Sequence, residues 1–407
     1  MDQAFLFGAI VKFGIWDQSL ECWAAGKAYS HAIGSAISRV AGAKHQVVYL
    51  ERNVDTSKTS NVLQIPNRRS LSVGQRALRK CLRIFGSREY DPYLASLERY
   101  LIGNRIDAVI GFVLSDRWAF SHVKTVSWIP DLQEKQLPNY FSENELRQRD
   151  ELNRIRIECS SSIMVSSDAV QNDFYRYFKE YSPRVLRFRF PSHYAFVNTP
   201  LDMPDSRVLQ KFGIDSPFFL VINQFWMHKN HTSVLKAVDL VRKLNGAVPR
   251  VVMIGQTNDY RDVAGRYLSA LLQQRSILRL DGHVKILGFV SEPDKDALLR
   301  TCTALIQPSL CEGWNTSVED AKALGIRVIA SDISTHREQL GDIGMLFDPT
   351  RPDVLAEQMS MVMQNPIVWS ASNEFDANKN YREISNQEAQ RFLDSLVELV
   401  ANGNMKA

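Results

Sequence analysis

The sequence predicts an α/β protein with two doubly wound parallel sheets that face a cleft. Its 407 residues exceed what one hydrophobic core usually organises, so two domains are expected. In both halves, short runs of Val, Ile and Leu alternate with amphipathic stretches, which is typical of a parallel sheet covered by helices on both faces. Between the halves, residues 192–206 are rich in turn formers and lack periodicity, so we place the domain boundary there.

The composition is that of a soluble globular protein, with 45% hydrophobic and 23% charged residues. A net charge of +4 permits an anionic ligand and does not indicate nucleic acid as a partner. Five scattered cysteines without a CxxC pair favour a reducing compartment and argue against a disulfide framework or structural zinc. The apolar start at residues 4–11 lacks a basic leader, and no run is long enough to span a bilayer. A cytoplasmic protein is therefore expected.

The first half, residues 1–195, is predicted to be a Rossmann-like domain. Its expected strands are apolar runs separated by helical stretches: residues 4–11, 45–51, 107–113, 124–130, 161–167 and 184–190.

The second half, residues 207–375, shows the same alternation more regularly. Its expected strands are residues 218–224, 249–255, 283–290, 303–309, 327–332 and 344–349. Helices are expected over residues 232–244 and 263–278, from Pro293, and from Ser317. Residues 376–407 are expected to form a helix that packs back on the first domain. In such open sheets, ligands bind beyond the carboxyl ends of the strands.

The stretch "CEGWNTSVEDAKALG" (residues 311–325) contains a strand-to-helix turn with two acids that the turn itself does not require. Thr316 followed by Glu319 fits a capping box, so Glu319 is expected to cap the helix. Glu312 and Asp320 have no such role.

A helix N-terminus suits a phosphate group, because its N–H groups are unpaired and its dipole is positive. The small residues Gly313, Asn315, Thr316 and Ser317 would let a phosphate approach the backbone closely. Two acids around that phosphate could bind sugar hydroxyls on either side. The alternative is that both acids only favour the helix dipole.

A second stretch, "NQFWMHKNH" (residues 223–231), follows the first strand of the second half. Lys229 lies where a strand-end loop opens a helix, which is a suitable place for a cation that pairs with phosphate. The alternative, which composition alone favours, is an ordinary solvated lysine. His228 and His231 are three residues apart without a Glu or Cys to join them, so no metal site is expected.

The order and spacing of these stretches, with "KILGFVSEPD" and "ASDISTHREQLGDIGMLFDP", resemble the donor-binding domain of the retaining glycosyltransferases of family four (glycosyl transferases group 1), which have the GT-B fold. The family signature places an acid, a second acid eight residues later, and then "G-x-P-V-I-A-S-D". Glu312, Asp320, Gly325 and "VIASD" occupy these positions. The resemblance covers residues 218–349.

The resemblance implies a role for each matching position. Glu312 would contact the donor sugar, Asp320 the ribose, and Lys229 the pyrophosphate. Backbone at Phe289 and Val290 would meet the base. The donor-binding set also includes Gln224, Gly313, Asn315, Thr316 and Ser317.

Three departures from the family pattern bear on these roles. Asp320 is one methylene shorter than the usual glutamate, so the ribose contact is either longer or made by Glu319 instead. Gln224 stands where an arginine is usual, which removes a positive charge. The residues "NTS" replace the usual glycine and proline of the turn.

In the first half, which the resemblance makes the acceptor-binding domain, Asp131 follows a strand where many members of the family have a His-Asp pair. Pro130 takes the place of the histidine. Asp131 is therefore a candidate for handling the acceptor hydroxyl, or else a turn or helix cap. The glycine-rich turn expected after the first strand is reduced to Gly14.

Residues 72–88 form a basic amphipathic stretch. Arg76, Lys80 and Arg83 share one helical face, which would suit peripheral contact with an anionic membrane on its inner face. The alternative is a domain helix whose basic face is simply solvated.

The sequence thus predicts a retaining hexosyltransferase-type enzyme that needs neither cofactor nor metal. It would move a sugar from a UDP- or GDP-sugar to a glycan or lipid-linked glycan during cell-surface polysaccharide synthesis. Two alternatives are a non-catalytic nucleotide-sugar-binding partner subunit and a GT-B nucleotide-sugar epimerase.

Overall fold

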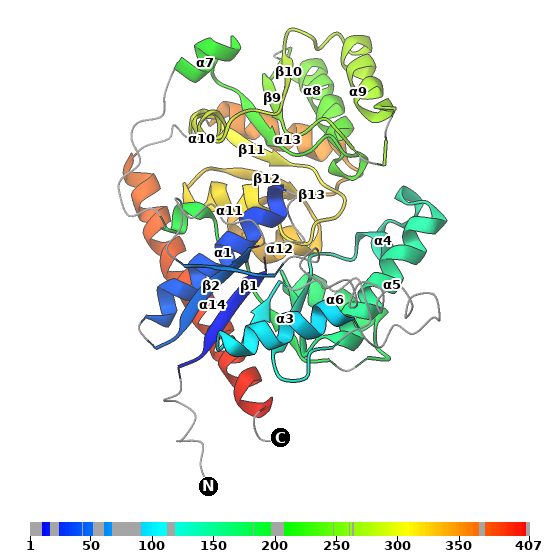
Figure 1. Ribbon diagram of the computed structural model, residues 1–407. Coiled ribbons are helices and arrows are strands. Elements are labelled where there is room, and N and C mark those ends of the chain that lie inside the picture. Colours follow the sequence, from blue (N-terminus) through cyan, green and yellow to red (C-terminus); the bar gives the residue numbers. More distant parts are fainter. Residues whose placement is uncertain are drawn as a thin grey trace. The chain divides into compact units, whose positions relative to one another are not determined.

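The computed structural model describes residues 10–16, 24–42, 44–51, 61–66, 91–111, 119–181, 183–196, 207–246, 248–259, 261–262, 264–365 and 371–403 (Figure 1). The chain divides into two compact units. Unit 1 contains residues Met1–Leu132, Glu143–Pro191 and Ile384–Ala407, and unit 2 contains Gln133–Ser142 and Ser192–Glu383. The predicted division at residues 195, 207 and 375 differs from these units chiefly in the short segment Gln133–Ser142, which groups with unit 2.

Unit 1 contains a parallel sheet of seven strands in the order β3-β2-β1-β4-β5-β6-β7. The strands are β1 (Lys12–Trp16), β2 (Gln46–Glu51), β3 (Val62–Gln64), β4 (Ala108–Ile110), β5 (Lys124–Ile129), β6 (Ser162–Val165) and β7 (Val185–Arg187). The helices are α1 (Ala24–Ala41), α3 (Pro92–Gly103), α5 (Glu143–Cys159), α6 (Asp168–Tyr177) and the later turns of α14 (Ala371–Gly403).

Helices cover both faces of the unit 1 sheet, because successive strand residues point to opposite sides. On β5, Ile129 packs in a cluster with α6 residues such as Phe174. The preceding residue, Trp128, faces the other way and contacts the rings of Tyr29 from α1 and Phe190. This is the doubly wound arrangement that the apolar strands predict.

Unit 2 contains a parallel sheet of six strands in the order β10-β9-β8-β11-β12-β13. The strands are β8 (Phe219–Ile222), β9 (Val251–Ile254), β10 (Val284–Gly288), β11 (Ala304–Gln307), β12 (Val328–Ser331) and β13 (Met345–Phe347). The α-helices are α4 (Gln133–Gln136), α7 (Arg207–Phe212), α8 (His231–Asn245), α9 (Arg266–Ile277), α10 (Glu292–Thr301), α11 (Thr316–Ala323), α12 (Ser334–Leu340) and α13 (Pro352–Gln364). Short 3₁₀ turns include η4 (Pro138–Tyr140), η5 (His193–Phe196) and η6 (Met227–Lys229).

Two separate cores flank the unit 2 sheet. Phe219 and Val221 of β8 pack with side chains of α8, α9 and α13. Leu220 of the same strand packs on the opposite face with side chains of α7, α10, α11 and α12. Both faces are therefore buried, which explains why these strands are continuous apolar runs. The predicted α/β fold class with two Rossmann-like domains is confirmed.

The strand order of unit 2 reverses at β8, and this reversal positions the functional site. The chain builds outward from β8 through β9 to β10, and later strands continue from β11 on the other side. The loops that follow β8 and β11 therefore diverge at the carboxyl edge of the sheet. Ligands of open α/β sheets bind at such a point.

The first described strand is β1 at Lys12–Trp16. Of the strand predicted at residues 4–11, residues 4–9 lie outside the described ranges, and Ile10 and Val11 directly precede β1. The prediction that Gly14 belongs to a turn after the first strand was wrong. Gly14 lies inside β1 and not in a turn, where a Cβ would come within 2.6 Å of Leu50 Cδ1. The short edge strand β3 was not predicted.

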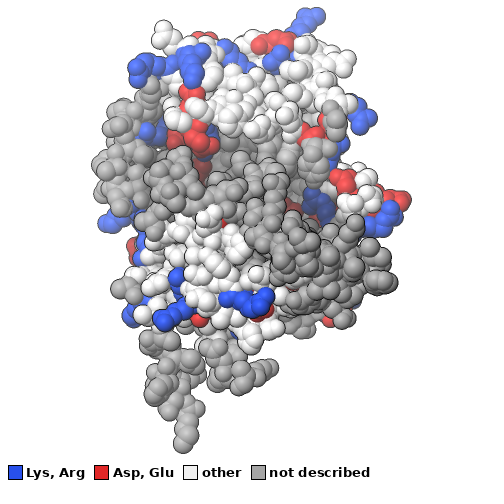
Figure 2. All heavy atoms as spheres, viewed as in Figure 1, with Lys and Arg blue, Asp and Glu red and all other residues white. Residues whose placement is uncertain are grey.

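The surface visible in Figure 2 carries its described basic and acidic side chains in small mixed groups. This pattern agrees with the mild net charge of the chain. The basic stretch with Arg76, Lys80 and Arg83 lies outside the described residues. None of the helices in the described part of the chain combines the length and apolar character needed to cross a membrane.

Gly255, directly after β9, should be intolerant of a side chain. Its φ is +147°, and a Cβ there would lie 2.0 Å from the backbone oxygen of Asn223. Gly255→Ala is expected to lower the free energy of unfolding by about 2–5 kcal/mol. Gly246 is the control, because its φ is +68° and no described atom lies within 4 Å of its Cβ position. Gly246→Ala should cost about 1–2 kcal/mol. Equal costs in urea denaturation would contradict the close approach of the two strand ends.

Candidate active site

A buried ion pair lies at the carboxyl ends of the neighbouring strands β8 and β11. Lys229, the last residue of η6, follows β8, and Glu312 follows β11. The Lys229 ammonium donates to Glu312 Oε1 at 2.7 Å, and the side chains are only 10% and 9% exposed. Two predicted residues, 83 positions apart in the sequence, are thus in direct contact. Removing either one would leave a buried charge without its partner.

Asn315 orients Glu312 and is the N-cap of helix α11. Its Nδ2 lies 3.3 Å from Glu312 Oε1, and its Oδ1 accepts from the backbone N–H of Val318 at 3.2 Å. The predicted capping box of Thr316 and Glu319 was therefore wrong. The N-cap is Asn315, one residue earlier, because an Asn side chain there reaches the N–H three residues on while its backbone stays extended.

Buried side-chain amides form a hydrogen-bonded group next to the Lys229–Glu312 pair. Gln307 Oε1 accepts from Asn223 Nδ2 at 2.8 Å and lies 3.2 Å from Asn315 Nδ2. Gln307 Nε2 in turn donates to the carbonyl of Ile222 at 3.2 Å. Sequence reasoning missed Asn223 and Gln307 as site residues. The signal was a polar amide at the end of an otherwise apolar strand, where a buried position must have a partner.

His336 completes the buried polar group. Its Nδ1 lies 2.9 Å from the carbonyl of Ser331, and its Nε2 lies 3.4 Å from Asn315 Nδ2. Burial lowers the pKa of His336 and outweighs the opposing charge of Glu312, so the ring is neutral at pH 7. The Nδ1 then donates to Ser331 and Nε2 accepts from Asn315. This histidine was also missed, although it lies in the stretch "ASDISTHREQLGDIGMLFDP" that carries the resemblance.

Glu319 is held by other protein side chains. It is buried, and its carboxylate accepts from Tyr381 at 2.7 Å, from Gln339 at 2.8 Å and from Lys322 at 3.0 Å. Burial raises the pKa of Tyr381 well above its usual value, so the phenol remains a donor. The Glu319 carboxylate thus links α11 with α12 and α14 and has no capping role.

Asp320 points to a different set of partners. Ser192 donates its hydroxyl to Asp320 Oδ1, and His193 Nδ1 and Lys295 Nζ lie 3.7 Å and 3.8 Å from the carboxylate. Burial alone would raise the pKa of Asp320, but hydrogen bonding by His193 and the charge of Lys295 outweigh it and lower the pKa. Asp320 is thus a buried, ionised carboxylate beside the Lys295 ammonium and the His193 ring.

The remaining predicted donor residues occupy the same edge of the sheet at varying depth. Gln224 follows β8 and is half-buried, whereas Thr316 is exposed at the first turn of α11. Ser317 approaches the carbonyl of Ile222 at 3.4 Å, and Gly313 is buried in the turn. After β10, Phe289 is 66% exposed and Val290 packs against the core.

Asp131, the candidate on the acceptor side, belongs to unit 1. It follows β5 and is half-buried. The chain enters unit 2 two residues later, at Gln133.

Arg261, which follows β9, contacts the turn that carries Lys229, although the sequence did not indicate it. Its guanidinium lies 5.1 Å from the centre of the Trp226 ring and 5.2 Å from that of Phe141. It also donates to Gln133 Oε1 at 3.1 Å and lies 3.5 Å from His228 Nδ1. Arg261 therefore holds the segment 133–142 against the turn that carries Lys229.

The described residues contain no group of three His, Cys, Asp or Glu side chains arranged to hold a metal ion. His231 stacks on Phe225, with ring centres 4.6 Å apart, and burial lowers its pKa to about 3. His231 is therefore a neutral packing residue.

Glu319→Ala should destabilise the fold more than loss of a cap would. It removes the buried carboxylate to which Tyr381, Gln339 and Lys322 donate, so a cost of about 2–4 kcal/mol in urea denaturation is expected. Glu292→Ala is the matched control, because Glu292 also pairs with a lysine three residues on but is 72% exposed. Its cost should stay below about 1 kcal/mol. Similar costs for the two variants would contradict this role.

The His193–Asp320 contact should stabilise unit 2 within one pH window. Burial lowers the pKa of His193, but hydrogen bonding to Asp320 outweighs it, so the net pKa is raised. The His193 contribution is present below its unfolded pKa and is lost as pH rises through its raised folded value. The Asp320 contribution is present above its unfolded pKa and is lost as pH falls through its lowered value. Their sum is largest between about pH 4 and 6.5.

The measurement compares the unfolding free energies of the parent and His193→Gln at pH 5.5 and pH 8.5. The difference between the two proteins should shrink at the higher pH. If the difference in unfolding free energy is the same at both pH values, the charge of His193 does not contribute to stability.

Residues 205–383 match the model of the family described as glycosyl transferases group 1. A curated relative, the O-antigen chain mannosyltransferase B of Escherichia coli, is 21% identical over 245 residues, which cover 60% of this chain and 62% of the relative. The match thus spans less than two thirds of that relative's length.

Solved structures share the fold across nearly the whole chain. Alr3699/HepE of Anabaena, solved in complex with UDP and glucose, has a TM-score of 0.63 and 17% identity, covering 95% of this chain and 100% of that one. WaaG, described as a glycosyltransferase involved in lipopolysaccharide biosynthesis, has a TM-score of 0.57 and 13% identity, covering 96% and 99%. Residues 205–383 of this protein are thus similar to the glycosyl transferases group 1 model, in a chain that shares the two-sheet GT-B fold with these solved structures.

Proposed function

We propose that this protein is a retaining glycosyltransferase that transfers a hexose from a nucleotide-sugar donor to a glycan or lipid-linked glycan. The observation that carries this proposal is the buried Lys229–Glu312 pair at the point where the unit 2 strand order reverses, inside the region similar to the glycosyl transferases group 1 model. Burying two charges costs desolvation free energy, and at the ligand-binding edge of a sheet such a pair more often serves function than stability.

The donor pyrophosphate would lie between Lys229 and the start of α11. The backbone N–H groups of Thr316 and Ser317 have no acceptor among the described residues, so they remain available to phosphate oxygens. Charge develops on the leaving diphosphate during transfer, and these preorganised donors would stabilise it. The proposal requires no metal or cofactor.

Glu312 would contact the sugar beside the reacting carbon, where positive charge develops in the transition state. Its position is set by Lys229 and Asn315, so the carboxylate is already oriented before substrate binds. The incoming hydroxyl would attack from the face that the diphosphate leaves, which retains the anomeric configuration. Asp131 is our candidate for handling that hydroxyl.

Asp320 is our proposed ribose ligand. Its carboxylate accepts from Ser192, so a ribose hydroxyl would join or replace that serine. Glu319 is the weaker candidate, because three side chains already donate to it. Phe289 is exposed after β10 and could cover the base.

The names of two relatives favour a cell-surface glycan as the acceptor class, and we propose a peripheral position on the cytoplasmic face of a membrane. One is a mannosyltransferase of O-antigen chains, and another acts in lipopolysaccharide biosynthesis. The solved complexes of the Anabaena protein with UDP-glucose make UDP-sugars the first donors to test, with GDP-sugars beside them.

A second candidate function is a non-catalytic nucleotide-sugar-binding subunit. Gln224 favours it, since this position lacks the arginine charge usual in the resembling family. Arg261 offers a cation at the adjacent strand end, although its described contacts bind it to Asp259 and Gln133. Turnover distinguishes the two functions.

The deciding experiment incubates the purified chain with a panel of UDP- and GDP-sugars, with and without glycan acceptors, and determines product linkage. An α-linked product from an α-linked donor supports the proposal, and Glu312→Gln should lower kcat far more than donor affinity. Donor binding without transfer or hydrolysis would favour the subunit function. An isomerised nucleotide sugar without acceptor would favour an epimerase.

Substitutions of Lys229 and Glu312 should separate protein stability from nucleotide affinity. Lys229→Met leaves the Glu312 charge buried and unpaired, so it should lower the melting temperature as well as UDP or GDP affinity. Adding Glu312→Gln should restore much of the melting temperature but not the affinity, which should remain roughly 10- to 100-fold weaker. Parent-like affinity for both diphosphates in the stable double variant would remove Lys229 from the phosphate site.

A further inference from the structure

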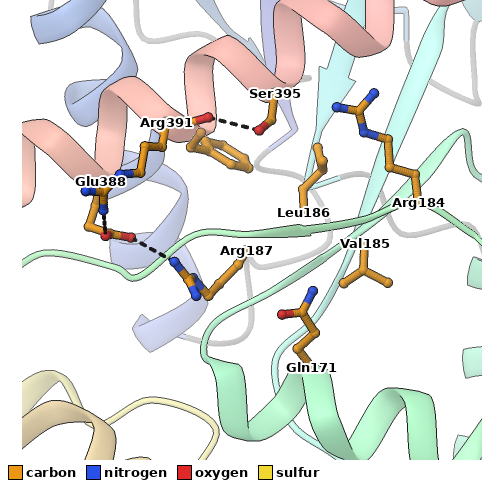
Figure 3. A pocket seen from close by; sticks show the side chains of 9 residues that line it. Gln171, Arg184, Val185, Leu186, Arg187, Glu388, Arg391 and Ser395 are labelled. Carbon is orange, nitrogen blue, oxygen red and sulfur yellow. Dashed lines mark hydrogen bonds and ion pairs between the residues drawn. The ribbon is translucent and has the colours of Figure 1, made fainter.

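A small cavity of about 290 Å³ lies within unit 1, and none of its lining residues has a role assigned above (Figure 3). It is bordered by α6, by the edge strand β7 and by α14. Figure 3 shows Arg187 from the strand and Arg391 from the helix meeting at Glu388 on one side of the cavity. Residues far apart in the sequence thus form one polar pocket.

Guanidinium groups outnumber carboxylates in the lining. Arg184, Arg187 and Arg391 line the cavity, whereas Glu388 is the acid among its lining residues. The other acids that pair with these arginines, Asp168 and Glu398, are not part of the lining. The cavity itself is therefore lined by an excess of positive charge.

Several donors in this pocket are unused. Arg187 Nε is buried and has no hydrogen-bond partner. Arg391 pairs with Glu388 and is 64% exposed, and Arg184 pairs with Glu398 through a single nitrogen. Arg187 pairs with Asp168 through Nη1 and with Glu388 through Nη2, so Nε is its remaining donor. Arg184 and Arg391 each pair through one nitrogen and retain further N–H donors.

A purely structural network would account for part of this arrangement. Glu388 is 9% exposed and pairs with Arg187, Arg189 and Arg391, which joins α14 to the sheet edge. That role requires no cavity and leaves the buried Nε of Arg187 without an acceptor. A bound anion would supply acceptors for the unused donors.

We propose that this pocket binds the phosphate group of a small molecule or lipid headgroup. Arginine favours phosphate because its planar fork donates two parallel hydrogen bonds to an oxyanion. The volume is at the lower end of ligand sites, which suits a phosphate with a small organic substituent. The Gln171 carboxamide, directed from α6 toward β7, is a further donor (Figure 3). The site uses residues of unit 1 alone and does not depend on the proposed transferase activity.

The first test is a calorimetric titration of the full chain with inorganic phosphate at low ionic strength. The titration is repeated in the Lys229→Met/Glu312→Gln double variant, so that phosphate bound in unit 2 does not contribute. Binding should persist there and weaken roughly 10- to 100-fold in Arg187→Gln and in Arg391→Gln. Arg147→Gln is the control, because Arg147 is a 71%-exposed, ion-paired arginine elsewhere in unit 1.

Glu388→Gln should strengthen phosphate binding, whereas the arginine substitutions should weaken it. If Glu388 competes with phosphate for the arginines, its neutral isostere should bind phosphate several-fold more tightly even though the fold is less stable. Absence of phosphate binding in the parent would overturn the proposal. So would an equal loss in Arg147→Gln, which would show general charge attraction, or no loss in Arg391→Gln.

The source of the phosphate is separated by two probes. Glycerol 3-phosphate tests a soluble ligand, and vesicles containing phosphatidic acid test a lipid headgroup. Dependence of either on Arg391 supports the pocket and identifies which source it accepts. If both bind independently of Arg187 and Arg391, the pocket is not the site.

Discussion

The buried contact between the Lys229 ammonium and the Glu312 carboxylate is the constraint on which the carboxyl edge of unit 2 depends. Two ions removed from water are tolerated only when they touch and their other hydrogen-bonding capacity is met. Asn315 meets part of it at Glu312, and Thr335 holds the Glu312 carbonyl at 2.7 Å. The loops after β8 and β11 therefore cannot move independently, and a ligand meets a site already oriented.

A layer of neutral polar groups lies beneath that pair. Asn223 donates to Gln307, and both Gln307 and His336 accept from the amide of Asn315. Neutral groups suit this depth because their burial costs less than that of further charges. Asn315 belongs to both layers, since one end of its amide caps α11 and the other contacts Glu312. The same side chain therefore caps α11 and orients the Glu312 carboxylate.

The adjacent acids Glu319 and Asp320 show how a single residue step separates two roles. Successive helix residues are rotated by about 100°, so neighbours face different surroundings. Glu319 turns to Tyr381 and Gln339, which join α11 to later helices. Asp320 turns to Ser192, His193 and Lys295. Neither carboxylate can replace the other without moving the helix.

The sequence by itself determined the two sheets and the order of their strands along the chain. Runs of β-branched and aliphatic residues specify buried parallel strands locally, and Lys229 and Glu312 lie in the loops that follow two of these strands. What the tertiary structure alone decided depends on partners distant in sequence. The N-cap of α11 is Asn315 and not Thr316. Both residue types are suitable caps, so only the backbone geometry of the folded chain decides between them. Glu319 is explained by Tyr381, 62 residues later, and the arginine pocket joins β7 to α14. Such contacts form only when folding brings separate elements together, and no local pattern records them.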